Sequence, residues 1–124
     1  TRFVVGAAAQ AGVRRVIHLS TSGTVAVGDD ADVVHHEDDP VPLSFIHRWP
    51  YYLSKWLAER AASDALRLVG GDTELVLLNP SLVLGPGDTR GSSTTDVKRF
   101  LNREIPIVPG GGFSAVMAQP PRGS

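Results

Sequence analysis

The sequence predicts an α/β fold built on a parallel sheet. Two short runs rich in aliphatic and β-branched residues, 13–19 and 74–78, have the composition of strands. Between them lie a loop and a long helical pattern, which together provide enough chain to cross from one parallel strand to the next. Another helical pattern precedes the first run, and this alternation of helix and strand is typical of α/β proteins.

The first helix is expected over residues 2–11, where small and apolar residues recur at helical spacing. Its apolar face is predicted to comprise Phe3, Val4, Ala7, Ala8 and Ala11. Gly12 would end this helix, and the strand at 13–19 follows directly. The second strand, at 74–78, is almost continuously apolar, which is typical of a strand covered on both faces.

A long helix is expected from about residue 50 to residue 68, after a loop rich in acidic residues and proline. Pro50 suits the first helical position, and Gly70 and Gly71 would end the helix. Its spacing predicts an apolar stripe made of Leu53, Leu57, Ala61, Ala65 and Leu68.

After Leu84 the sequence no longer shows the alternation of helical and strand patterns and becomes rich in glycine, proline, serine and threonine. Residues 85–88 carry the glycine and proline of a turn, and a short helix is expected over 96–103, capped by Thr94 or Thr95. The tail after Ile105 is rich in proline and glycine, so we expect it to pack little and to be mobile at its end.

Composition excludes several classes of protein. The 124 residues correspond to about one domain, and 12 Lys+Arg against 13 Asp+Glu give a net charge of −1, which offers no electrostatic footprint for nucleic acid. The sequence has no cysteine, which excludes a disulfide scaffold and any Cys-ligated metal and is compatible with the cytoplasm, where we expect the protein. No apolar run approaches the roughly 20 residues that span a bilayer, so we expect no membrane partner.

Tyr51 and Lys55 lie four residues apart, and on a helix they would be neighbours on one face. An ammonium beside a tyrosine favours the phenolate, so such a tyrosine can donate or accept a proton, as carbonyl–alcohol interconversion requires. The same spacing also occurs by chance in many helices, and a motif match is only a hypothesis. Tyr52 would point elsewhere, so we expect it to be a packing residue.

Polar residues follow both predicted strands. Ser20, Thr21 and Ser22 come after the first strand, and Asn79 and Pro80 after the second. Ligands of open α/β sheets bind at the carboxyl ends of the strands, which makes this edge a candidate site. The alternative for the three hydroxyls is an ordinary turn rich in serine and threonine.

The segments VRRVIHLSTSG, PYYLSK and LLNPSLVLGPGD, in this order, resemble the second half of an extended short-chain dehydrogenase/reductase. They are most similar to the NAD(P)-dependent epimerase/dehydratase and dihydroflavonol-reductase-like group, and the resemblance spans about residues 1–113. It implies a Rossmann-like doubly wound parallel sheet and NAD or NADP as cofactor. This sheet would be incomplete, because the glycine-rich GxxGxxG phosphate loop and the first βαβ units are absent from the sequence.

The resemblance also implies a division of the chain and a role for each matching residue. Residues 1–84 would form the carboxyl-side part of the NAD(P)-binding domain, and 85–124 the start of a substrate-side lobe. Tyr51 would be the catalytic acid/base, Lys55 would hold the nicotinamide ribose, and Ser22 would bond the substrate oxygen. The cofactor-binding positions would be Ser20, Thr21, Tyr51, Lys55, Asn79, Pro80 and Leu82.

The resulting hypothesis is an NAD(P)-dependent oxidoreductase, epimerase or dehydratase. It would act by hydride transfer on a small sugar-like or ketone/alcohol substrate, and the chain would be a fragment of a longer enzyme. Two alternatives stay open: a non-catalytic nucleotide-sensing or scaffold protein on the same fold, and a non-functional truncated product. In several relatives the Tyr–Lys helix also builds a dimer interface, which suggests a homodimer.

Two other patterns in the sequence are weaker candidates for a site. The run at 35–39 (HHEDD) could suggest a metal, but we interpret it as a solvated acidic loop and expect no metal. Ser22 with His18 could suggest a hydrolase, but the G-x-S-x-G turn that such enzymes place around the serine is absent.

Overall fold

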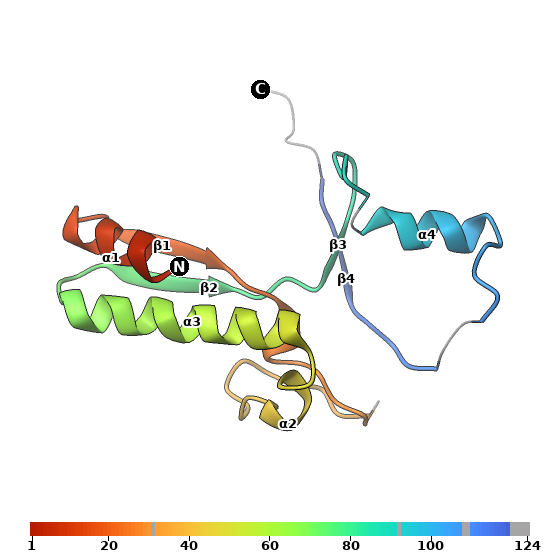
Figure 1. Ribbon diagram of the computed structural model, residues 1–124, viewed down its shortest axis with the longest axis horizontal. Helices are drawn as coiled ribbons and strands as arrows, with labels where there is room; N and C mark the ends of the chain where they lie inside the picture. The colour runs from red at the N-terminus through yellow and green to blue at the C-terminus, as the bar shows by residue number, and fades with distance from the viewer. Residues whose placement is uncertain (31, 92, 108–109, 120–124) are drawn as a thin grey trace. The chain divides into compact units, whose positions relative to one another are not determined.

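The computed structural model describes residues 1–30, 32–91, 93–107 and 110–119. Its elements in chain order are α1 (Arg2–Gln10), β1 (Arg15–Leu19), the 3-10 helix η1 (Ser22–Thr24), α2 (Leu43–Ile46), α3 (Pro50–Val69), β2 (Glu74–Leu78), β3 (Leu82–Leu84), α4 (Thr94–Leu101) and β4 (Ala115–Met117) (Figure 1). The chain divides between Pro80 and Ser81 into two compact units. In the described part of the chain, no helix has the length and apolar character needed to cross a bilayer.

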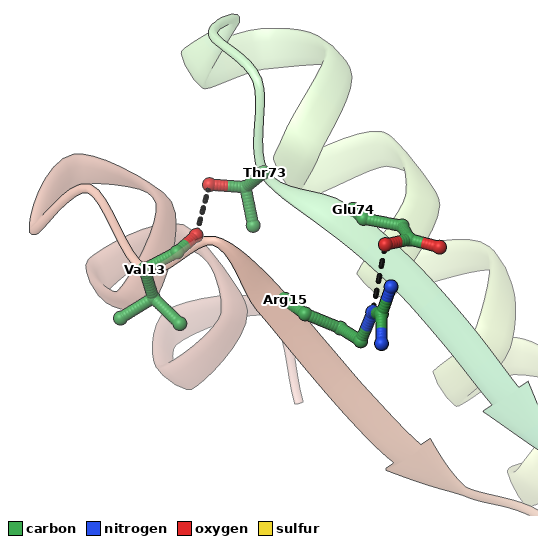
Figure 2. Close-up of polar contacts among 4 residues, drawn as sticks. All are labelled: Val13, Arg15, Thr73 and Glu74. Atoms are coloured by element: carbon green, nitrogen blue, oxygen red, sulfur yellow. Dashed lines mark hydrogen bonds and ion pairs between the residues drawn. The ribbon is translucent and has the colours of Figure 1, made fainter.

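The first unit is built on the parallel pair β1–β2, which confirms the predicted pairing. The register runs from Arg15 opposite Glu74 to Leu19 opposite Leu78. Figure 2 shows how the amino ends of the strands are joined: the Thr73 hydroxyl donates to the Val13 carbonyl at 2.7 Å, and Arg15 Nε contacts Glu74 Oε2 at 2.7 Å. Both charged side chains are about half exposed, so this ion pair defines the register more than it stabilises the fold.

The core of this unit lies where α1 and α3 pack on one face of the strand pair. It comprises Val5, Ala62 and Ala65, with Val16, Leu66 and Leu75 packed against them. Alanine at positions 62 and 65 has a short side chain, which lets the two helix backbones approach closely. This packing fixes α3, and therefore its amino end, relative to the ends of both strands.

The predicted buried face of α1 is wrong. Phe3 and Val4 are 90% and 74% exposed, whereas Val5 and Ala9 are buried. Almost every residue of this helix is apolar or small, so hydrophobic spacing alone does not single out one face.

The predicted stripe of α3 is only partly correct. Ala65 is buried as expected, but Leu57 and Leu68 are 52% and 71% exposed, and Ala62 is buried in their place. The prediction that the second strand is covered on both faces is wrong at its end, because Leu78 is 46% exposed. Among the described residues, α1 and α3 cover one face of the strand pair, the face that carries Val16 and Leu75.

The second unit pairs β3 with β4 in parallel, from Leu82 opposite Ala115 to Leu84 opposite Met117. Residues 115–117 of the tail therefore form a strand, but all three side chains are exposed, as expected of a tail that packs little; residues 120–124 lie outside the described residues. The boundary between the compact units falls before β3, and the predicted functional division at residue 84 stays a prediction.

The cap predicted for α4 is also wrong. Thr94 and Thr95 are the first residues of the helix and do not precede it. The Asp88 carboxylate takes the capping role: its Oδ2 accepts from the backbone N–H groups of Ser93 and Thr94, each at 3.0 Å. A carboxylate there satisfies helix N–H groups that have no partner inside the helix.

Candidate active site

The carboxyl ends of β1 and β2 bring most of the predicted site residues together. The backbone N–H of Ser22 donates to the Pro80 carbonyl at 2.9 Å. The Asn79 side-chain amide donates to the Thr21 carbonyl at 3.2 Å. Leu82 lies in the second unit, where it begins β3, and its role at the cofactor stays a prediction.

A tight turn of 3-10 helix holds Ser22 at this edge. Thr21 has extended backbone angles and precedes η1, and its side-chain oxygen accepts weakly from the Gly23 N–H at 3.4 Å. The Thr24 N–H then donates to the Thr21 carbonyl at 3.2 Å, and the Val25 N–H to the Ser22 carbonyl at 3.0 Å. These local bonds fix the backbone around Ser22, which is itself partly exposed.

The amino end of α3 supplies the Tyr–Lys pair. Pro50 occupies the first helical position, as predicted, and Tyr51 and Lys55 follow on successive turns. Lys55 Nζ donates to the Leu19 carbonyl at 3.2 Å and lies 5.9 Å from the centroid of the Tyr51 ring. The lysine therefore joins α3 to the end of β1, while Tyr51, 58% exposed, is open to small molecules.

Tyr52 has a different environment from its neighbour. Its ring lies 5.5 Å from that of Tyr51 and 6.1 Å from that of Trp49, measured between centroids. It is partly buried and sits against Gly23 of η1. This agrees with the prediction that Tyr52 packs.

Sequence reasoning missed two residues of this site, Glu59 and Thr24. The Glu59 Oε1 atom accepts from the hydroxyls of Ser20 and Thr24 and from the Asn79 amide. The available signal was the spacing, since Glu59 follows Lys55 by four residues just as Lys55 follows Tyr51. Thr24 gave no signal beyond following the run of hydroxyl residues 20–22 after one glycine.

His18 lies on β1, on the face that α3 covers. Its Nε2 atom is buried and has no hydrogen-bond partner among the described residues. Burial lowers the pKa of His18 below its ordinary value of 6.5, and the Lys55 ammonium lowers it further, while the Glu59 carboxylate opposes both. The ring is therefore neutral at neutral pH. No hydrogen bond described in the structure joins His18 to a serine, so the geometry gives the hydrolase alternative no support.

His18→Leu is expected to remove a loss of stability on acidification. Because folding lowers the pKa of His18, the unfolded chain takes up its proton first as pH falls below 6.5, and the free energy of unfolding drops. Denaturant titrations at about pH 7.5 and about pH 5.5 should show a smaller difference in the variant. A leucine occupies this partly buried position without an unpaired buried nitrogen, so stability at the higher pH should not fall.

Another group with a lowered pKa, Asp39, does not contribute between these two pH values. The His36 N–H holds the pKa of Asp39 below its ordinary value of 3.8, so the contribution of Asp39 is lost only at lower pH. An unchanged pH dependence between about pH 7.5 and about pH 5.5 in His18→Leu would contradict the assignment.

The run of histidines and acids at 35–39 has its own contacts. His35 Nδ1 lies 3.5 Å from Asp39 Oδ2, and the His36 backbone N–H donates to the same oxygen at 2.9 Å. Within the described ranges, no group of three or more His, Asp or Glu residues is placed to hold a metal ion.

Several known proteins are similar in sequence to this chain. Over 79 residues the chain is 39% identical to dihydroflavonol 4-reductase from Arabidopsis thaliana, covering 60% of this chain and 20% of that protein. Over 90 residues it is 39% identical to cinnamoyl-CoA reductase 2 from the same plant, covering 68% and 26%. A putative dihydroflavonol 4-reductase from Synechocystis sp. is 28% identical over 118 residues, covering 94% and 33%.

The chain thus spans between a fifth and a third of the length of these curated relatives. Its residues 1–113 match one family model, and this range includes the whole first unit, most of the second and all of the candidate site. By this match the chain belongs to the NAD dependent epimerase/dehydratase family.

Proposed function

We propose that this chain is the carboxyl-side catalytic portion of an NAD(P)-dependent reductase of the extended short-chain type. The observation that carries the proposal is the contact of Lys55 with the Leu19 carbonyl at 3.2 Å. It places the Tyr–Lys face of α3 beside the loop that begins at Ser20. A proton donor, an ammonium and a row of hydroxyls then share one sheet edge, where α/β proteins bind ligands.

The fragment status is part of the proposal. The family implies a Rossmann-like α/β fold, and the β1–α3–β2 unit with its parallel pairing agrees with part of one. Two observations support a longer protein: the relatives are three to five times longer than the matched segments, and no GxxGxxG loop occurs in this sequence. The phosphates and adenine of the cofactor would then be bound by residues outside this chain.

The residues at this edge fit the nicotinamide end of NAD(P). When bound, the cofactor supplies a hydride from its nicotinamide ring. Lys55 would bond the ribose hydroxyls, since its ammonium has three donors and one is used on Leu19. Tyr51 would deliver a proton to the substrate carbonyl oxygen, and the Ser22 hydroxyl would orient that oxygen.

The relatives favour reduction of a carbonyl over epimerisation or dehydration. The names of the matched plant proteins describe reductases, one acting on a dihydroflavonol and one on cinnamoyl-CoA. We therefore propose a small carbonyl compound as substrate, with an aromatic ketone or acyl-CoA as the first candidates. A sugar-like substrate is the second candidate.

The test is a hydride-transfer assay on the full protein, which is produced from the coding sequence of this chain and any coding sequence contiguous with it. Loss of NADH or NADPH absorbance is followed with a dihydroflavonol, cinnamoyl-CoA and a nucleotide-sugar as substrates. Deuterium from nicotinamide-labelled cofactor should appear on the product carbon. Binding of cofactor without transfer to any carbonyl compound would favour the non-catalytic alternative on the same fold.

We also propose a homodimer formed through α1 and α3. Phe3 and Leu68 are 90% and 71% exposed, and both line a hollow of about 480 Å³ between the two helices. Apolar surface of this kind is typical of a protein interface. Leu68→Glu is expected to shift a dimer to a monomer in analytical ultracentrifugation. A monomeric wild-type protein would contradict the proposal.

A further inference from the structure

A carboxylate that the proposed chemistry does not use lies at the centre of the site. Glu59 Oε1 accepts from the Ser20 hydroxyl, from Thr24 Oγ1 at 2.9 Å and from Asn79 Nδ2 at 3.1 Å. Ser20 and Thr24 are buried, with 4% and 1% of their surface exposed. The acceptor comes from α3, and its donors come from the segment after β1, from η1 and from the segment after β2.

The strength of this network follows from its charge and its burial. Hydrogen bonds to an ionised acceptor are roughly twice as strong as those between neutral groups. Ser20 and Thr24 are buried, and Glu59 and Asn79 are partly buried. The bonds therefore lie where the dielectric is lower than in water and polarise one another, which makes the arrangement more rigid. The Asn79 amide also donates to Thr24 Oγ1 at 2.9 Å, so the donors are bonded to one another as well as to Glu59.

The network connects the parts that the proposed reaction needs. Glu59 lies one turn after Lys55, which lies one turn after Tyr51. On the other side, Ser20 and Thr24 flank Ser22 in the sequence. Glu59 therefore joins the helix that carries the proton donor to the loop that carries the orienting hydroxyl.

A second contact extends the coupling to the end of β2. The Ser22 N–H donates to the Pro80 carbonyl at 2.9 Å, and Pro80 directly follows Asn79. The residue after each strand is thus bonded to Glu59, and the backbone at Ser22 is bonded to the segment that Asn79 holds. Displacement of Asn79 would move Pro80 and with it the partner of the Ser22 amide.

From this geometry we propose that Glu59 is a positioning residue, which fixes Ser22 relative to Tyr51 by holding the segments after β1 and β2 against α3. The inference rests on the proposed function. Glu59 takes no part in proton or hydride transfer itself. Its effect on the rate comes through placement, and a displacement of about 1 Å at a reacting group lowers a rate by up to a hundredfold.

Glu59→Gln is the informative substitution, because the amide keeps the shape of the side chain but removes the charge and puts a donor where an acceptor is needed. In the active protein we expect kcat to fall about tenfold or more, with a smaller change in KM. Glu74→Gln is the matched control, since it makes the same change at the opposite ends of the strands, where Glu74 contacts Arg15. We expect its kcat to equal that of wild type.

A double-mutant cycle with Ser22→Ala separates positioning from a general loss of stability. If Glu59 acts by placing the Ser22 hydroxyl, Glu59→Gln should change kcat by less than about twofold once that hydroxyl is absent. An equal fall in kcat with and without the hydroxyl would overturn the proposal. So would a full wild-type kcat in Glu59→Gln.

Amide hydrogen exchange tests the same proposal without activity. The Ser22 and Val25 amides, bonded to the Pro80 and Ser22 carbonyls, should exchange at least about tenfold faster in Glu59→Gln than in Glu74→Gln. Unchanged exchange would overturn the positioning role. If the protein transfers no hydride but these amides do respond, the proposed function fails while the positioning of the loop by Glu59 stands.

Discussion

Tyr51→Phe is expected to lower the rate of hydride transfer at least about a hundredfold. The substitution removes one hydroxyl and keeps the ring. Tyr51 is 58% exposed and its ring lies against that of Tyr52, so the apolar contacts should survive the change. What is lost is the proton donor that the proposed reaction needs at the carbonyl oxygen, and positioned proton transfer contributes about 10²–10⁴ in rate.

The neighbouring residue provides the control. Tyr52→Phe removes the same hydroxyl one residue later, from a ring that packs between Tyr51 and Trp49. We expect near wild-type turnover in this variant and unfolding temperatures close to wild type in both. Turnover of Tyr51→Phe within about threefold of wild type would remove Tyr51 from the reaction. A comparable loss in both variants would indicate a structural effect of the aromatic cluster.

The sequence predicted elements best where local chemistry is decisive. The sequence predicts the second strand at its observed bounds, because a short aliphatic run between Gly71 and Pro80 has few other structures open to it. It predicts the long helix to within about one residue at its carboxyl end, because Pro50 and Gly70 mark the two ends. The buried faces were predicted less well, since they depend on which elements pack against each helix.

The same distinction applies to the site. Tyr51 and Lys55 are recognised from their spacing within one helix, which needs no knowledge of the rest of the fold. The Glu59 network joins residues that are 39, 35 and 20 positions apart, and they meet only because α3 packs against the pair β1–β2. Asp88 gave a turn signal but no indication that it would cap α4. A contact that depends on tertiary packing leaves little trace in one sequence.

Gly23→Ala is expected to destabilise the first unit and to impair the site at the same time. Gly23 is buried in η1, directly after Ser22. A Cβ atom there would lie less than 3.0 Å from three ring carbons of Tyr52, so the ring or the turn must move. The ring has little room to give way, since it also contacts the rings of Trp49 and Tyr51.

The expected cost follows from overpacking of a filled site. Forcing a methyl group into such a position typically costs about 1–3 kcal/mol in the free energy of unfolding. Because the turn carries Ser22 and the ring contacts Tyr51, we also expect kcat to fall about tenfold or more. Denaturant unfolding measures the first effect and the hydride-transfer assay the second.

Two further variants identify the cause. Gly28→Ala is the matched control, because a Cβ there would lie 3.4 Å from His35 Nε2, an ordinary contact that should leave stability and turnover unchanged. Tyr52→Ala combined with Gly23→Ala removes the ring that the new methyl group meets. If that contact is the cause, Tyr52→Ala should lower the free energy of unfolding less in the Gly23→Ala background than in the wild-type protein. Additive losses would instead indicate that alanine fails at position 23 because of the backbone of η1, and that Tyr52 does not link this turn to the Tyr–Lys helix.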